Sequence, residues 1–498
     1  MNGAQSGSTS RRPPSHRPTV KRFPILFLVV VVLIGAGLAD RITGVRSTPV
    51  PAPTLAAVGA PLSSESSSWY CAGGTGNSTG IANSIVYLTN TSRDPLVASA
   101  HVVNDSGVSQ SKKFVLPALA EVSFVPDTVV QGNWVATRIE VNGGGVVATQ
   151  VVSGPNGWSE SPCSSTIGST WYFADGSTAS GSRLLVSLYN PAATNAVVDL
   201  TCVTQQGAIQ PQPFEGIVVP AGQLVEEEIG TYVQNAASVA VAAYARSGRI
   251  VANEIQLANG NGIQGVSLQL GSPATTQRAT LPLSQDVPGG SSTISVFNPS
   301  SSAENVTVSV KLPSGPVAPF NDTVPAQSAW SLVTSSQSRI PLNVAFSATV
   351  TVSGGPGVVV SRAMSAAFGS SVPQWGSAVA SVPSYLAVSG WVVPFPGTPS
   401  SPALPGATPL DLAVYNAGTR PVTFSISSIT SSGIVPLKPP VAVRLTPGEL
   451  TVIPQAVMSA AGPYPLVIKA SGPVAMLENL IPAGAGGVVT ISGVPLRY

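Results

Sequence analysis

Hydrophobic and polar residues alternate along short stretches of the chain, and the pattern occurs four times. In each copy an asparagine has apolar residues two and four positions before it and eight and ten positions after it, with Ser, Asp or Thr at position nine. An alternation of period two is typical of a strand with one buried face. The turn-forming residues that follow the asparagine indicate a short connection between two strands. The aligned positions are Asn90, Asn190, Asn298 and Asn416.

Further landmarks recur in the same order in every copy. A glycine follows the asparagine after 17 residues, then come a turn centred on proline and two apolar stretches separated by a glycine-containing turn. Counting these stretches gives about seven strands per copy, which is typical of an antiparallel β-sandwich of immunoglobulin-like architecture. The glycines are Gly107, Gly207, Gly315 and Gly433.

We therefore predict an all-β protein made of tandem immunoglobulin-like antiparallel β-sandwiches after one N-terminal transmembrane helix. Trp-Tyr or Trp-Val opens three copies, whereas the third has Leu-Pro-Leu at 281–283. This leaves open whether the first strand of the third copy is absent or modified. The predicted sandwiches, called segments 1 to 4 below, are residues 69–165, 166–272, 273–384 and 385–498.

The composition supports this fold and excludes one class of partner. Only 9% of the 498 residues are charged, against about 25% in a typical soluble domain, and the 49 Gly and 46 Pro disfavour long helices. Residues 1–46 contain seven basic residues and one acid, so the remainder carries a net charge of −4. A weakly acidic body has no electrostatic footprint for nucleic acid, which we exclude as a partner.

The N-terminal region predicts export. Residues 1–22 form a basic tail, and residues 23–39 contain no charge. Basic residues before an apolar stretch of this length predict a single-pass signal anchor with the N-terminus in the cytoplasm and the body outside the membrane. The small residues before Asp40 leave a second alternative open, in which the leader is cleaved near Ala39 and the body is secreted. Residues 40–68 predict a Pro/Ala/Ser linker.

The second copy carries phrases that resemble a known family. It reads Trp-Tyr-Phe-Ala-Asp-Gly-Ser-Thr at 171–178, followed by Leu-Tyr-Asn-Pro at 188–191, Val-Pro-Ala-Gly at 219–222 and Ile-Val-Ala-Asn-Glu at 250–254. It resembles the WYFAEGST-type β-sandwich repeats of an actinobacterial family of membrane-anchored exported proteins that is catalogued as a domain of unknown function. The resemblance implies a location in the cell envelope and brings no catalytic residues to carry over.

Two of the three cysteines are predicted to pair. Cys71 lies at the start of segment 1 and Cys163 at its end, and exported proteins favour disulfides. A bond between them clamps the two ends of one sandwich. Cys202 aligns with valine in two other copies, which predicts a buried free thiol.

The opening tryptophans Trp69, Trp171 and Trp391 leave two alternatives open. They could form a stacking platform for a sugar ligand, or they could pin the first strand of each sandwich against its core, which we favour. The one carboxylate run, residues 226–228, predicts a solvated strand end. No Cys/His spacing resembles a zinc site and no glycine-rich phosphate motif joins a strand to a helix. We predict no catalytic residue, no metal and no cofactor.

We therefore expect a non-enzymatic, membrane-anchored extracytoplasmic protein that serves as a structural or assembly-scaffold component of the cell envelope. Its partners are then the membrane, through the leader, and envelope proteins or polysaccharide. The alternative is a binding module for envelope polysaccharide or peptidoglycan that assists a glycosyltransferase.

Overall fold

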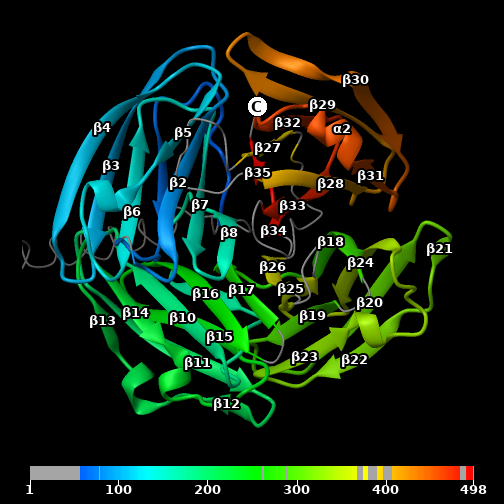
Figure 1. The fold of residues 1–498 in the computed structure, drawn as a ribbon. Helices are drawn as coiled ribbons and strands as arrows, with labels where there is room; N and C mark the ends of the chain where they lie inside the picture. The colour runs from blue at the N-terminus through cyan, green and yellow to red at the C-terminus, as the bar shows by residue number, and fades with distance from the viewer. Residues whose placement is uncertain are drawn as a thin grey trace, which may run out of the picture. The chain divides into compact units, whose positions relative to one another are not determined.

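Antiparallel β-sheets make up almost all of the regular structure in the computed structural model of the chain (Figure 1). The structure describes residues 56–77, 79–260, 263–286, 290–366, 374–379, 388, 390–395, 407–482 and 489–496, all of which belong to the unit Pro53–Tyr498. The predicted tail at 1–22, the leader at 23–39 and the linker up to residue 55 lie outside the described residues. Within the described part, none of the helices has the length and apolarity needed to cross a membrane.

Segment 1 consists of two four-stranded sheets. Their strand orders are β1-β6-β3-β4 and β5-β2-β7-β8. The short 3₁₀ helix η1 (Pro126–Thr128) follows β5. The strands are β1 (Ser67–Cys71), β2 (Asn83–Asn90), β3 (Leu96–Asn104), β4 (Ser109–Leu116), β5 (Ala120–Phe124), β6 (Val135–Val141), β7 (Val146–Gly154) and β8 (Gly157–Pro162).

Segment 2 repeats this arrangement. One sheet has the order β12-β11-β15-β9, with β13 also paired to β11, and the other contains β14-β10-β16-β17. The elements are β9 (Thr170–Phe173), β10 (Ser182–Tyr189), β11 (Ala196–Thr204), β12 (Gly207–Ile209), η2 (Gln212–Phe214), β13 (Ile217–Val219), β14 (Leu224–Glu228), η3 (Ile229–Thr231), β15 (Ala240–Ser247), β16 (Val251–Gly260) and β17 (Ile263–Leu270).

Segment 3 shares a sheet with segment 2. Its strands β26-β25-β19-β23 continue the sheet of β14-β10-β16-β17, because β17 and β26 pair in parallel. Its second sheet has the order β18-β24-β20-β21, with β22 paired to β20. The elements are β18 (Arg278–Gln285), β19 (Ser291–Asn298), β20 (Glu304–Leu312), β21 (Gly315–Pro316), β22 (Phe320–Val324), β23 (Ser328–Val333), η4 (Thr334–Ser336), β24 (Ala345–Val352), β25 (Val359–Ala366) and β26 (Gln374–Val379).

The first strand of segment 3 is present in modified form. β18 pairs with β24, but its register shifts between Leu281 and Ser284. Pro282 lies at this irregularity, and a proline has no N–H with which to continue a ladder of hydrogen bonds. The Leu-Pro-Leu sequence therefore interrupts the pairing register of the strand without removing the strand.

Segment 4 again has two sheets, of orders β30-β29-β32-β27-β35 and β31-β28-β33-β34. Its helix α2 is a single short turn. The elements are β27 (Gly390–Val393), β28 (Ala407–Asn416), β29 (Val422–Thr430), β30 (Gly433–Leu445), β31 (Leu450–Pro454), α2 (Gln455–Ser459), β32 (Leu466–Ala470), β33 (Val474–Pro482), β34 (Val489–Ile491) and β35 (Val494–Pro495).

The four aligned asparagines have one structural role. Each is buried at the end of the second strand of its segment or directly after it. Asn190 shows the pattern: its Nδ2 donates to the carbonyls of Thr194 and Val219 at 2.8 and 3.0 Å, and its Oδ1 accepts from the backbone N–H of Ala192 at 3.0 Å. The other three asparagines make the same bonds to the residues two and four positions later. Each also donates to a carbonyl 26 to 29 residues later. The side chain thus satisfies the polar backbone of a buried turn.

The four aligned glycines are explained by backbone conformation. All have positive φ, between 80° and 138°, at the start of a strand or in a turn. For Gly207, Gly315 and Gly433 a Cβ atom would meet nothing within 4 Å. Lack of space is therefore not the reason for glycine at these three positions. The turn requires a conformation that residues with a Cβ rarely adopt.

Candidate functional site

Four large polar side chains occupy equivalent places in the four segments. They lie on β7, β16, β25 and β33, and each pairs with the residue four positions before the aligned asparagine. All four are no more than 3% exposed. Buried polar groups of this size need partners, and their partners come in part from the neighbouring segment. The residues are Gln150, Glu254, Arg362 and Glu478.

At the junction of segments 1 and 2, Gln150 forms hydrogen bonds with residues of both segments. Its Nε2 donates to Ser84 Oγ at 2.9 Å and to the carbonyl of Gly73, and its Oε1 accepts from Asn253 Nδ2 of segment 2 at 3.0 Å. Close by, a Cβ on Gly73 would collide with the side chain of Ser187. Glycine at position 73 thus permits the close approach of the two segments.

Glu226 lies in the same junction and corrects one prediction. The sequence predicts a solvated strand end at 226–228, but the carboxyl of Glu226 accepts a hydrogen bond from Ser187, and its Oε1 is buried with no partner among the described residues. Burial raises the pKa of Glu226 to about 8, against the opposing effect of the bond from Ser187. Gly73 of segment 1 lies close to this carboxyl, because a Cβ built on Gly73 would come within 3.8 Å of Glu226 Oε2.

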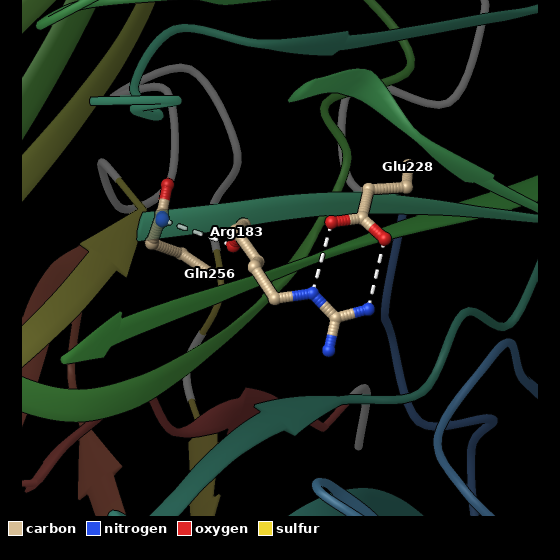
Figure 2. A network of polar contacts seen from close by, with 3 residues as sticks. All are labelled: Arg183, Glu228 and Gln256. Atoms are coloured by element: carbon tan, nitrogen blue, oxygen red, sulfur yellow. Dashed lines mark hydrogen bonds and ion pairs between the residues drawn. The ribbon is translucent and has the colours of Figure 1, made fainter. Parts of the chain in front are cut away.

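Only Glu228 of this run lies in an exposed ion pair. Arg183 donates two parallel hydrogen bonds, of 2.9 and 2.8 Å, to the carboxylate of Glu228, and Gln256 donates to the carbonyl of Arg183 (Figure 2). The bonds from Arg183 lower the pKa of Glu228.

The Arg183–Glu228 pair is expected to contribute little to stability. Its side chains are 45% and 37% exposed, so water and salt screen the attraction. Arg183→Gln is expected to lower the free energy of unfolding by about 0.5 kcal/mol in dilute salt, and by less in 1 M NaCl. Urea unfolding at the two salt concentrations measures this, and a loss that salt leaves unchanged would contradict the electrostatic explanation.

At the junction of segments 2 and 3, carboxyl and amide groups meet across the shared sheet. Ser295 Oγ donates to Asp175 Oδ1 at 3.0 Å, and Gln269 Nε2 donates to Ser361 Oγ at 2.9 Å. Burial raises the pKa of Asp175 to about 6. Burial, and then the nearby Asp175, raise the pKa of Glu254 well above its usual range.

The junction of segments 3 and 4 contains a buried cation. Arg362 is 1% exposed and interacts with Asp286 and Asp411. Burial lowers its pKa to about 10, and the two carboxyls oppose this effect. Lys311 Nζ of segment 3 also donates to the carbonyl of Gly448 of segment 4 at 2.8 Å.

At the junction of segments 4 and 1, three glutamates come together. Thr89 Oγ1 and the backbone N–H of Phe395 donate to Glu121 Oε2 at 2.8 and 3.3 Å. Glu160 interacts electrostatically with Glu121 and with Glu478. The buried ionisable groups described above are thus spread over four junctions. In the described part of the chain, no three His, Cys, Asp or Glu side chains are arranged to hold a metal ion.

The opening tryptophans are all in the interior. Trp69, Trp171 and Trp391 are 0%, 0% and 1% exposed. Trp171 Nε1 donates to the carbonyl of Ile250 at 2.9 Å, and Trp391 Nε1 to that of Val474 at 3.0 Å. The hypothesis that these three residues stack on a sugar is wrong, because no ring face is accessible. Each packs its first strand against the core instead.

The cysteines have the arrangement that their positions predict. Cys71 and Cys163 form a disulfide, which ties the end of β1 to the residue after β8. Cys202 is a buried free thiol, and burial raises its pKa to about 12. A thiol in this state is a poor nucleophile.

The buried groups at the junctions are the functional residues that sequence reasoning missed. The signal in the sequence was weak: the four polar residues pair with the same position of the second strand, but they lie 60, 64, 64 and 62 residues after the aligned asparagine. Their burial could not be read from it, because an isolated polar residue in an alternating strand is normally assigned to solvent.

Comparisons with solved structures give low similarity. The Anabaena sensory rhodopsin transducer is 18% identical and matches 17% of this chain and 91% of its own, with a TM-score of 0.16. A Thermotoga maritima protein, 1070, is 12% identical over 21% and 92% of the two chains, with a TM-score of 0.19. A tetra-tandem repeat from the extending region of a large adhesion protein is 13% identical over 82% and 93%, with a TM-score of 0.12.

Comparisons of the amino-acid sequence identify one matching family model. None of the curated proteins matches the chain significantly. Residues 145–363, from the start of the last hairpin of segment 1 to β25 of segment 3, match the model of a family of unknown function (DUF5719).

Proposed function

We propose that this protein is a non-catalytic structural or assembly-scaffold component of the cell envelope. One observation carries the proposal: the buried polar side chains join neighbouring segments at four junctions instead of converging on a single cleft. Catalysis by acid and base groups needs such a convergence on one substrate. A chain that uses these groups to fix four sheet pairs against one another is suited to holding other molecules in place.

We further propose that each segment is an immunoglobulin-like sandwich and that residues 23–39 anchor the body outside the membrane. The two antiparallel sheets of each segment support the first point. The disulfide between Cys71 and Cys163 supports the second, because such bonds persist in oxidising compartments. The resemblance to actinobacterial membrane-anchored repeats points in the same direction. Cleavage near Ala39 remains the alternative fate of the leader.

A second candidate function, binding of envelope polysaccharide, is favoured by a different aromatic residue. Tyr244 on β15 is 54% exposed. It pairs with Asp199 and Thr170 on the adjacent strands, and Asp199 forms an ion pair with Arg246. An exposed ring beside polar side chains on a sheet provides one stacking surface and hydrogen-bonding groups for a sugar.

Affinity capture on the immobilised protein separates the two functions. Envelope proteins and purified envelope polysaccharide are applied in separate experiments. A scaffold is expected to retain a defined set of proteins that recover this chain in reciprocal capture. Retention of polysaccharide that Tyr244→Ala abolishes, and that Tyr464→Ala in segment 4 leaves intact, would favour the second function. Release of soluble fragments from the polysaccharide would overturn the non-catalytic proposal.

A further inference from the structure

The last segment of the chain closes on the first through non-covalent contacts. Gly59 precedes segment 1 and lies against it, because a Cβ built on Gly59 would come within 3.1 Å of Val147 Cγ1. Gly59 forms a bridge with Leu496, and its N–H donates to the carbonyl of Pro495 at 2.7 Å. Further apolar residues of both segments share one hydrophobic cluster, including Tyr87 and Trp158 of segment 1 and Met476 of segment 4. The closure is therefore a contact between residues more than 400 positions apart.

Three carboxyl groups lie inside this contact. Glu160 on β8 is 3% exposed and Glu478 on β33 is 2% exposed, and the Oε1 atom of Glu121 on β5 is buried. Neither oxygen of Glu160 makes a hydrogen bond of normal geometry among the described residues, and the same holds for Glu121 Oε1. The Thr149 hydroxyl is the one polar neighbour that lowers the pKa of Glu160, and the effect of burial outweighs it. A buried carboxylate without a partner is costly, whereas the neutral acid is tolerated far better.

Few positively charged side chains lie close enough to compensate the negative charge of these three carboxyls when they ionise. The strands β5, β8 and β33 and their partners β2, β7, β28 and β34 contain no Lys, Arg or His, and neither does β17, which packs on β8. The next acid, Asp411, adds negative charge beside Glu478, and Arg362 interacts with Asp411 and Asp286 instead. Arg278 begins β18, which packs on β33. The other titratable groups here are Tyr87, which has a partner, and Tyr464, which lines the same depression as Glu478.

We propose that the contact between segments 1 and 4 is a proton-locked closure, which Glu121, Glu160 and Glu478 hold only while they are protonated. In neutral or acidic surroundings the last segment stays on the first. In alkaline solution the ionised carboxyls move into water and the two segments separate there, while the sheets within each segment persist.

The opening of the contact at higher pH follows from the linkage between proton binding and closure. Burial raises the pKa of Glu121 and Glu478 to about 8 and that of Glu160 well above its usual range. The bonds from Thr89 and Phe395 lower the pKa of Glu121 against this effect, and the nearby Asp411 raises the pKa of Glu478 further. In the open form the solvated carboxyls titrate near 4.5. The closed form therefore binds more protons than the open form between about pH 4.5 and 8. In that window each carboxyl favours opening by about tenfold per pH unit.

Hydrogen exchange of the whole protein tests the closure. Peptides covering 56–66 and 489–496 report the contact, and β20 of segment 3 serves as an internal reference. Relative to the reference, the opening constant is expected to rise by about 100-fold or more from pH 5.5 to 7.5. A plot of the logarithm of the opening constant against pH should have a slope that is smaller by about one in Glu160→Gln. In the triple variant Glu121→Gln, Glu160→Gln and Glu478→Gln this slope should be abolished.

Glu140→Gln is the matched control, because Glu140 lies on the exposed side of β6; it should leave the slope unchanged. A wild-type opening constant that does not change with pH would overturn the proposal, as would a triple variant with the wild-type slope. Calcium chloride is added in a separate arm. If calcium restores protection at pH 8.5, the carboxyls hold a cation instead of protons, and the proposal is also wrong.

Discussion

Replacing Asn190 by aspartate is expected to destabilise segment 2 by about 4 kcal/mol. The side chain of Asn190 is 0% exposed, and its Nδ2 donates to two carbonyls. In Asn190→Asp an oxygen replaces this donor, so three acceptors face one another without a proton. The free energy of local unfolding, measured by hydrogen exchange of β10 and β16, reports the loss.

The same variant should recover partly in acid. Protonation of the introduced carboxyl supplies one donor, so the deficit should be smaller at pH 4 than at pH 7. Asn321→Asp is the matched control, because Asn321 is exposed and only accepts a bond from Thr307 Oγ1 at 2.8 Å; it should change the stability of its segment by less than about 0.5 kcal/mol. A deficit of similar size at both sites would show that the buried turn does not depend on the amide.

The repeated strands could be predicted from the sequence because their signals are local. Alternation around Asn90 or Asn298 and the glycine 17 residues later are determined by a single turn and its two strands. The same applies to the pairing of Cys71 with Cys163, since both lie at the borders of one segment. Local patterns were sufficient wherever one segment supplies all the partners of a residue.

The junctions could not be predicted, because their partners come from other segments. Glu160 occurs in a polar stretch that reads as a surface strand, and its carboxyl is buried near Glu478, which lies more than 300 residues later. The parallel pairing of β17 with β26, which joins two sheets into one, likewise links distant stretches. The tryptophans are different, because burial against the core is the alternative that the sequence favours for Trp69, Trp171 and Trp391, and all three are buried.

Removing the disulfide is expected to destabilise segment 1 by roughly 4–5 kcal/mol. The bond closes a loop in which the cysteines are 92 residues apart, and opening a loop of this size mainly increases the entropy of the unfolded chain. Both sulfur atoms are buried, so the double variant Cys71→Ser, Cys163→Ser is a cleaner test than added reductant. Hydrogen exchange resolved by segment measures the change.

The native contacts around the bond are expected to survive its loss. Tyr70 and Ser164 exchange two backbone hydrogen bonds of 2.7 and 2.8 Å beside the disulfide, and the N–H of Cys163 donates to Ala148 at 3.0 Å. The folded segment should therefore keep its strands, and the free energy lost should appear as unfolding of segment 1 at lower denaturant concentration, with segment 3 unaffected. Cys202→Val, a residue that aligned copies already contain, should be nearly neutral. If the double variant loses no more than this control, the two sheets are held by packing alone and the covalent link adds nothing to their stability.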